Sequence, residues 1–387
     1  MPAGTIYPSE CVKEIDRDTG VTVWRLTSYR GNSNHLYFTN NCFYDRNTKI
    51  VFAGDRDDRS NYFSLDLKTF VITQLTDLPR MPYPYDYKLL EAYVDSVRNC
   101  CYYFAGQDLF RLDLMTLQTQ VIYTMPAGFI HHIVSCAENG TYVYTSIYED
   151  MSSRFAVDTQ HGYVGFADIA KAKPVSRIMK INADGSGAAC IHEETCWIAH
   201  VNVNPKNENE LTFCHEGPWN LIDHRVWGMD TVSGRIWKIR ECGKGDVIGH
   251  EYWYSDGVHL GYHGHGSGGR VMGRVRFDNT SDEPVSFPFN TGHIFSLNRD
   301  LIVGDGDRDG TYLRLWKWNG AAYEEPRALC IHASSWKSQN SHAHPRFSPD
   351  GKNVLFTSDR TGYDQVYLAE VPEDISVLPL LKTLSKL

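Results

Sequence analysis

Short runs of apolar residues, alternating or continuous and each followed by a polar turn, recur along this chain of 387 residues. Because side chains alternate between the two faces of a strand, such short runs predict β-strands rather than helices. One run of this kind occurs in each of seven consecutive segments, at residues 50–55, 101–106, 142–146, 211–215, 259–263, 301–305 and 354–359. Most are followed by a second run and several by a third, as at 61–67 and 71–76.

The regular spacing of these runs predicts a closed all-β fold. Seven units of several strands each, at spacings of roughly 40 to 70 residues, are typical of a seven-bladed β-propeller. The last unit reaches Leu368 without a clear fourth strand, whereas residues 21–27 resemble the outer strand at 70–76. We therefore expect the N-terminal strand to complete the last blade and to remove an exposed sheet edge. The chain is predicted to be a single domain over residues 1–387, with an insertion at about 150–173 in the fourth repeat that forms a surface loop.

Composition and charge indicate which partners and which cellular compartment to expect. The formal net charge is -9 and no long basic run is present, so we expect no nucleic-acid partner. No run of about 18 apolar residues occurs, and the first residues lack the basic and apolar segments of a signal peptide. The ten cysteines are scattered without a Cys-x-x-Cys pair, which indicates free thiols in a reducing compartment. We expect a cytoplasmic protein with no membrane partner.

The stretch 339–344, Gln-Asn-Ser-His-Ala-His, is the first candidate for chemistry. If it is a strand, His342 and His344 project from one face, and two imidazoles at that separation can chelate one cation. Gln339, in the approach to the strand, could add an oxygen ligand. Nitrogen and oxygen donors without cysteine suit a borderline or harder divalent ion better than a thiolate-type structural zinc site. An isolated His-x-His is more often a pair of strand histidines with no ligand, so the rest of the chain decides between the two interpretations.

Histidine recurs at one position of the predicted repeats. Six of the seven predicted inner strands carry it near the start of the blade, as His35, His131 with His132, His200, His250, His293, and His342 with His344. Loops expected at the same rim hold His215, Arg225 and a glycine-rich segment at 263–270. Imidazole and guanidinium groups that are far apart in the sequence are therefore predicted to converge on one site.

Other motifs carry less weight. The acidic stretch 305–310 resembles the start of an EF-hand Ca²⁺ loop, but its twelfth position is Trp316 and no helices flank it. We interpret it as a hairpin turn. No Gly-x-Ser-x-Gly motif, P-loop or dinucleotide-binding fingerprint is present in the sequence.

Four longer stretches of the sequence form recognisable motifs. They are Phe-Cys-His-Glu-Gly-Pro at 213–218, Gly-His-Glu-Tyr-Trp at 249–253, the segment 296–306 with its Val-Gly-Asp-Gly, and Gln-x-x-His-x-His-Pro at 339–345. These stretches resemble the oligogalacturonate lyase family, and the resemblance extends over most of the chain. The family consists of seven-bladed propellers that act on short pectin fragments in the cytoplasm and bind manganese.

The resemblance implies a metal-dependent lyase that cleaves oligogalacturonates, such as digalacturonate or unsaturated digalacturonate, by β-elimination. It implies that His250 is the catalytic base and that Arg225 holds a carboxylate or stabilises negative charge. The implied ligands of the cation, Mn²⁺, are His293, Gln339, His342 and His344. Further substrate contacts are expected from His200, His215 and His35.

Two alternatives stay open at this point. The chain could be a lyase for another uronate-containing oligosaccharide, or a non-catalytic propeller that binds sugars or partners. The complete set of histidines and glutamine favours an enzyme, because a scaffold would not need it.

Overall fold

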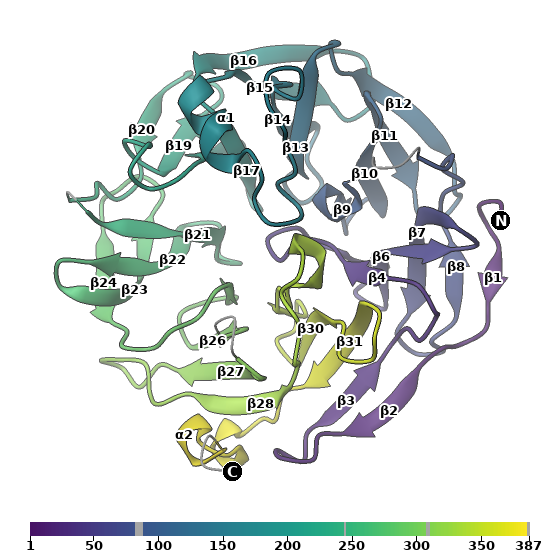
Figure 1. Cartoon of the computed structure of the whole chain (residues 1–387), viewed down its shortest axis with the longest axis vertical. Helices are drawn as coiled ribbons and strands as arrows, with labels where there is room; N and C mark the ends of the chain where they lie inside the picture. Colours follow the sequence, from purple (N-terminus) through teal and green to yellow (C-terminus); the bar gives the residue numbers. More distant parts are fainter. Residues whose placement is uncertain (82–87, 244, 307–309, 385–387) are drawn as a thin grey trace. The chain divides into compact units, whose positions relative to one another are not determined.

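The computed structural model describes residues 1–81, 88–243, 245–306 and 310–384. Within these residues the chain forms seven antiparallel sheets and a few short helices, which confirms the prediction of an all-β fold (Figure 1). The contacts between residues divide the chain into two compact units. Unit 1 takes residues 1–86 and 285–387, and unit 2 takes residues 87–284.

Unit 1 contains three of the sheets. The first, in spatial order, is β1 (Ile6–Tyr7), β8 (Ile72–Gln74), β7 (Arg59–Asp66), β6 (Lys49–Arg56) and β4 (Ser33–His35), with β5 (Phe43–Tyr44) also paired to β6. The second is β2 (Val12–Ile15), β3 (Thr22–Arg25), β31 (Gln365–Glu370), β30 (Asn353–Ser358) and β29 (Arg346–Phe347). The third is β25 (Ile294–Phe295), β26 (Leu301–Gly304), β27 (Tyr312–Lys317) and β28 (Arg327–Ile331). Its helices are η2 (Gln339–Ser341), η3 (Ile375–Val377) and α2 (Leu381–Leu384).

Unit 2 contains four sheets of four strands, which follow one another along the chain. The first is β9 (Tyr93–Asp95), β10 (Cys100–Ala105), β11 (Asp108–Asp113) and β12 (Thr119–Thr124). The second is β13 (Phe129–Ser135), β14 (Tyr142–Glu149), β15 (Val175–Asn182) and β16 (Ala188–Thr195). The third is β17 (Ile198–Asn204), β18 (Asn207–His215), β19 (Val226–Asp230) and β20 (Ile236–Lys238), and the fourth is β21 (Val247–Trp253), β22 (His259–Gly266), β23 (Gly269–Arg276) and β24 (Asp282–Ser286). Its helices are η1 (Leu89–Glu91) and α1 (Phe166–Ala172).

The N-terminal strand pairs with the last strand of the chain, as the sequence predicts. Residue Val23 of β3 lies opposite Ala369 of β31, and Trp24 lies opposite Leu368. The N-terminal and C-terminal segments, purple and yellow in Figure 1, therefore share one sheet. The prediction of a single N-terminal strand in this sheet is incomplete, because β2 pairs outside β3 and extends the sheet by one more strand.

The insertion predicted as a surface loop differs from the structure in two respects. It lies between β14 and β15, in the third repeat of the chain rather than the fourth, and it contains helix α1. Ile169 of this helix is fully buried and belongs to an apolar cluster with Tyr148 and Trp197. Burial of one face against the sheets explains why so short a helix forms here, since isolated helices of this length are not stable in water.

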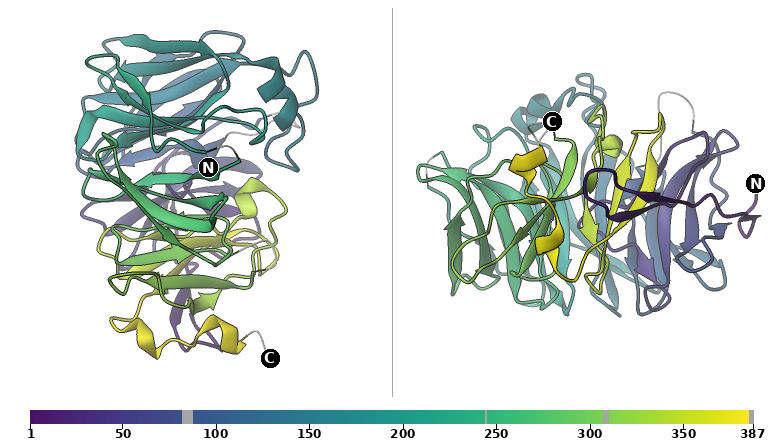
Figure 2. Two further views of the ribbon diagram at one scale, coloured as in Figure 1. Left: turned by 90° about the vertical axis from the view of Figure 1, so that its left-hand side faces the viewer. Right: turned by 90° about the horizontal axis from the view of Figure 1, so that it is seen from below.

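Apolar side chains fill the spaces between consecutive sheets of unit 2. One cluster joins Tyr102 of β10 with Val143 of β14, and the next joins Ile178 of β15 with Phe213 of β18. The sheets can be followed from two further sides in Figure 2. This face-to-face packing fixes the innermost strands of unit 2, which carry His131, His132, His200 and His250.

Candidate functional site

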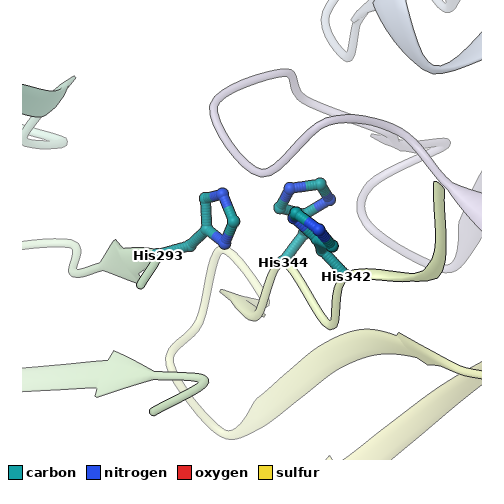
Figure 3. Close-up of side chains that lie close together, drawn as sticks. All are labelled: His293, His342 and His344. Atoms are coloured by element: carbon teal, nitrogen blue, oxygen red, sulfur yellow. The ribbon is translucent and has the colours of Figure 1, made fainter. Parts of the chain in front are cut away.

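Three buried histidines of unit 1 form a compact group of potential metal ligands. His293 directly precedes β25, whereas His342 and His344 lie between η2 and β29. Their imidazole rings lie next to one another (Figure 3). One ring nitrogen of each lies within 4.8 Å of the others, and all three residues are buried. The structure thus brings together three of the four predicted metal ligands.

The local backbone differs from the strand predicted for this stretch. Gln339 begins the short helix η2, His342 is extended with φ -74° and ψ 146°, and His344 has a left-handed backbone with φ 46°. The two rings converge, at 5.4 Å between centroids, through this turn and not through alternation along a strand. A left-handed conformation at a residue other than glycine costs on the order of 1–3 kcal/mol and is frequent at functional sites. Gln339 lies within one turn of His342, on the same segment as the other two donors.

Asp305 orients one of the three rings. Its carboxylate accepts a hydrogen bond from Nδ1 of His293 at 2.8 Å and a second from the backbone N–H of the same residue, also at 2.8 Å. Asp305 is completely buried. Since Nδ1 carries the proton in this bond, Nε2 of His293 keeps its lone pair, as a metal-binding histidine requires.

The sequence analysis assigned this aspartate to a hairpin turn. Part of that predicted turn, residues 307–309, lies outside the described residues. The Val-Gly-Asp-Gly pattern drew attention to the position, but nothing in the spacing predicted a hydrogen bond to His293.

Aromatic side chains surround the histidine cluster. The ring of Trp336 lies 4.4 Å from His342 and 5.8 Å from His293, and Phe38 lies 5.4 Å from His293. Three imidazoles in an apolar and largely buried setting provide nitrogen donors without thiolate, and Gln339 stays a predicted fourth ligand. This donor set suits a borderline divalent cation.

His35 supports the cluster from the neighbouring strand β4. Its Nε2 donates to the backbone carbonyl of His344 at 2.8 Å, and its Nδ1 accepts from the hydroxyl of Thr357 at 2.7 Å. Burial lowers the pKa of His35 to about 4, so the ring is neutral. Both ring nitrogens of His35 are engaged within the protein, although the sequence predicts a substrate contact for this residue.

In unit 2, a buried glutamate joins two of the predicted site residues. Glu216 accepts hydrogen bonds from the two terminal nitrogens of Arg225 at 3.0 and 3.3 Å. Its second oxygen lies 3.2 Å from Nε2 of His200. Burial alone would raise the pKa of Glu216, but the charges of Arg225 and His200 lower it well below the usual value. Glu216 is therefore a carboxylate that holds the guanidinium in place, a role that the sequence analysis did not assign.

The residues on either side of His250 also contact Arg225. The carboxylate of Glu251 lies 3.9 Å from Nε of Arg225. Gly249 lets the Arg225 side chain approach the backbone of β21, because a Cβ atom at residue 249 would lie only 3.1 Å from the same Nε. The register of β21 against β22 shifts between Gly249 and Tyr252, and His250 has φ 52°. Such bulges redirect side chains and are frequent beside active sites.

His250 forms a close pair with a second histidine. Its Nδ1 lies 2.7 Å from Nε2 of His263 on the adjacent strand β22, and the two rings are nearly parallel. The sequence analysis noted the glycine-rich segment around His263 without giving it a role. The pairing depends on the bulge in β21, which no local sequence pattern predicts.

His215 lies in a separate group of polar side chains. Its Nε2 lies 2.8 Å from Glu194 and its Nδ1 lies 3.1 Å from Asp223. Burial would lower the pKa of His215, but interactions with Cys196 and Glu194 raise it to about 10. Both ring nitrogens of His215 are thus held by carboxylates, and the substrate contact expected for it stays a prediction.

The comparison with known proteins decides the family. Residues 8–313 match the family model described as oligogalacturonate lyase. The chain belongs to the oligogalacturonate lyase family. The resemblance stated from the sequence is confirmed, and with it the expectation that the chain is an enzyme of the lyase class.

Two curated relatives share this name over nearly the whole chain. The oligogalacturonide lyase of Pectobacterium atrosepticum is 29% identical, with 97% of this chain and 100% of the relative covered. The oligogalacturonate lyase of Dickeya dadantii is 30% identical, with 93% of this chain and 96% of the relative covered.

Solved structures of two family members have the same fold. An oligogalacturonate lyase in complex with manganese superposes with a TM-score of 0.86 at 27% identity, and covers 97% of this chain and 100% of its own. The oligogalacturonate lyase of Vibrio parahaemolyticus has a TM-score of 0.84 at 28% identity, and covers 96% and 99%. With the seven sheets, this likeness confirms the predicted seven-bladed β-propeller.

Two further observations concern the cysteines and the possibility of a membrane-spanning helix. The ten cysteines, all of which lie among the described residues, form no disulfide. Among the residues that the structure describes, no helix has the length and apolar character needed to cross a bilayer. A cytoplasmic location stays a prediction.

Proposed function

We propose that this chain cleaves short oligogalacturonates by metal-assisted β-elimination, with Mn²⁺ as the cation. The observation that carries the proposal is the group of three buried histidines with ring nitrogens within 4.8 Å of one another, in a chain of the oligogalacturonate lyase family. A solved member of that family is a complex with manganese. A propeller that only binds partners would have no need of such a buried donor set.

The proposed metal ligands are His293, His342 and His344, with the side-chain oxygen of Gln339 as the fourth. Asp305 keeps Nε2 of His293 available, through the hydrogen bond that it accepts from Nδ1. When bound here, a divalent cation would neutralise the uronate carboxylate and stabilise the negative charge that develops next to it.

His250 is the proposed base. If it donates its Nδ1–H to Nε2 of His263, the lone pair on its own Nε2 is directed to the substrate. That nitrogen takes the C5 proton, the C5–H electrons form the C4–C5 double bond, and the C4–O4 bond breaks. Oxygen O4 leaves with the electron pair and is then protonated, which gives a 4,5-unsaturated product.

Arg225 is proposed to bind a substrate carboxylate. Burial would lower its pKa, but the neighbouring charges, including Glu216 and Glu251, raise it well above the usual value, so the guanidinium stays charged. Glu216 holds it from one side, and a planar fork fixed in this way can present its remaining N–H groups to an anion. His200 shares the same glutamate and is proposed to line the substrate site beside it.

The first experiment tests the metal site. His342→Ala and His344→Ala should each abolish tightly bound Mn²⁺ and lyase activity while the protein stays folded, because each removes one of three converging imidazoles. Elemental analysis measures the metal, circular dichroism the fold, and ultraviolet absorbance of the unsaturated product the activity. His161→Ala, at an exposed histidine, is the matched control. Undiminished metal in both cluster variants would refute the assignment.

The second experiment separates the base from the ligands. His250→Ala should reduce kcat by at least about a hundredfold, the usual contribution of a general base, while Mn²⁺ and substrate still bind. His293→Ala should instead lose affinity for Mn²⁺, and excess Mn²⁺ should restore part of its activity. If His250→Ala is purified without metal, or turns over at a near-normal rate, the two roles are exchanged or wrong.

The choice of substrate needs its own comparison. Digalacturonate and unsaturated digalacturonate are assayed beside oligosaccharides of other uronates, at equal concentration and with Mn²⁺ present. Highest kcat/KM for the galacturonates supports the proposal, whereas a higher value for another uronate supports a lyase of different specificity.

A further inference from the structure

A second group of metal-binding side chains lies in unit 2, where two neighbouring sheets adjoin. Glu194 is near the end of β16, Cys196 lies in the connection to β17, and His215 is the last residue of β18. Their ligand atoms, a carboxylate oxygen, a thiol sulfur and an imidazole nitrogen, all lie within 4.8 Å of one another. None of the three takes part in the elimination chemistry proposed above.

The imidazole of His215 is oriented for ligation. Asp223 accepts the hydrogen bond from its Nδ1 at 3.1 Å, which directs Nε2 toward Glu194 at 2.8 Å. A carboxylate behind the second nitrogen is the usual support of a metal-binding histidine. His192 adds a further imidazole, whose Nε2 lies 3.6 Å from the same oxygen of Glu194.

The ligand atoms of Glu194, Cys196 and His215 are already nearly as close together as a bound Zn²⁺ would require. Around one Zn²⁺ with bonds of about 2.0–2.3 Å, tetrahedral donor atoms are roughly 3.3–3.8 Å apart. Atoms already within 4.8 Å reach that arrangement by small side-chain movements. Glu194 and Cys196 are partly exposed, so a cation has access from solvent.

We propose that Glu194, Cys196 and His215, with His192 beside them, form a second metal site that binds a borderline cation such as Zn²⁺. Nitrogen, sulfur and oxygen donors together favour Zn²⁺, whereas the histidine cluster of unit 1 has no thiolate. On binding, the thiol proton of Cys196 and the Nε2 proton of His215 pass to solvent, and sulfur–metal and nitrogen–metal bonds form. The cation would tie the connection after β16 to the end of β18. This gives His215 a structural role in place of the substrate contact predicted from the sequence.

The thiolate of Cys196 gives the second site an optical signal that the histidine cluster of unit 1 cannot give. The full-length protein, stripped of metal under reducing conditions, is titrated with Co²⁺, whose thiolate complexes show a charge-transfer absorption in the near ultraviolet. The wild-type protein should show this absorption, and Cys196→Ser should lose it, bind one equivalent of Co²⁺ less, and keep its lyase activity with Mn²⁺. His342→Ala should keep the absorption, because the site in unit 1 contributes no sulfur.

Further variants separate this site from other thiols. Cys190→Ser, at an exposed cysteine of strand β16, should behave as the wild type. Asp223→Ala should weaken Co²⁺ binding by about 10- to 100-fold, the usual effect of removing a carboxylate behind a ligating histidine. The proposal is overturned if the wild type shows no thiolate absorption. It is equally overturned if the absorption persists in Cys196→Ser, or is lost in Cys214→Ser, which would assign it to the thiol beside Glu216. These outcomes are independent of whether the chain cleaves oligogalacturonates.

Discussion

At the scale of single residues, the contact between His250 and His263 constrains which ring nitrogen of the proposed base carries a proton. With 2.7 Å between Nδ1 and Nε2, one ring must donate and the other accept. Only the arrangement in which His250 donates leaves its own Nε2 able to take a proton. In the proposed mechanism, His263 would therefore select the productive tautomer and orientation of His250.

The first prediction at this scale concerns His263. His263→Leu removes the acceptor and should reduce kcat by about 10- to 100-fold, a share of the total contribution of a general base, with little change in KM. His263→Asn, whose amide oxygen can accept the same hydrogen bond, should recover part of the loss. Steady-state kinetics with saturating Mn²⁺ measure both variants. Equal losses in the two, or a loss confined to KM, would show that His263 only fills space.

Three histidines that the sequence analysis singled out, His293, His342 and His344, lie together in the structure, but the partners of the candidate site residues could not be predicted. His342, His344 and Gln339 stand in one short motif, so their spacing carried the hypothesis. Asp305 and Glu216 act through hydrogen bonds across 12 and 9 residues, to His293 and Arg225 respectively. Such contacts depend on sheet register and on turn conformation, and a hydrophobic pattern specifies neither.

At the scale of secondary-structure elements, two histidines of unit 2 share an irregularity. His200 and His250 have φ values of 49° and 52°, and each lies where the register of its strand shifts against the next. Strand existence was predictable from apolar alternation, but a bulge adds one residue, which shifts the phase of that alternation and redirects the side chains beside it. For this reason the sequence places these histidines on inner strands but does not give the direction of their side chains.

The N-terminal strands give a prediction at the same scale. Val23 of β3 is 1% exposed and pairs with the last strand, whereas Val12 of the added strand β2 is 38% exposed. Removing two methyl groups from a buried site costs about 2 kcal/mol, whereas exposed substitutions usually change stability by less than about 0.5 kcal/mol. Val23→Ala should lower the free energy of unfolding in urea by about that amount and Val12→Ala should not. Equal effects would mean that β2, which the sequence analysis missed, stabilises the sheet as much as β3 does.

At the scale of the whole molecule, groups whose pKa values are lowered by the fold make the folded state less stable in acid. Burial lowers the pKa of His332 to about 4, and this residue is fully buried. For Glu91, burial would raise the pKa, but Lys88 and His131 lower it to about 2. In both cases the unfolded state binds protons at a higher pH than the folded state, so acid favours unfolding. For the histidine the loss begins near pH 6.5, its ordinary pKa, and for the glutamate near pH 4.5.

The last prediction isolates the histidine contribution. Nδ1 of His332 accepts a hydrogen bond from the backbone N–H of Ser334 at 3.1 Å, and the amide oxygen of asparagine can replace that acceptor. Between pH 6.5 and about 4 the wild-type protein should lose up to about 1.4 kcal/mol of stability per pH unit through this residue alone. His332→Asn should show a correspondingly flatter dependence of stability on pH in that interval, and the same dependence above pH 7.

Urea unfolding followed by tryptophan fluorescence at a series of pH values measures this dependence. A chelator is present throughout, so that loss of bound metal on acidification does not contribute. His161→Asn, at an exposed position, should keep the wild-type slope, and an unchanged slope in His332→Asn would show that another group carries the acid sensitivity in this range.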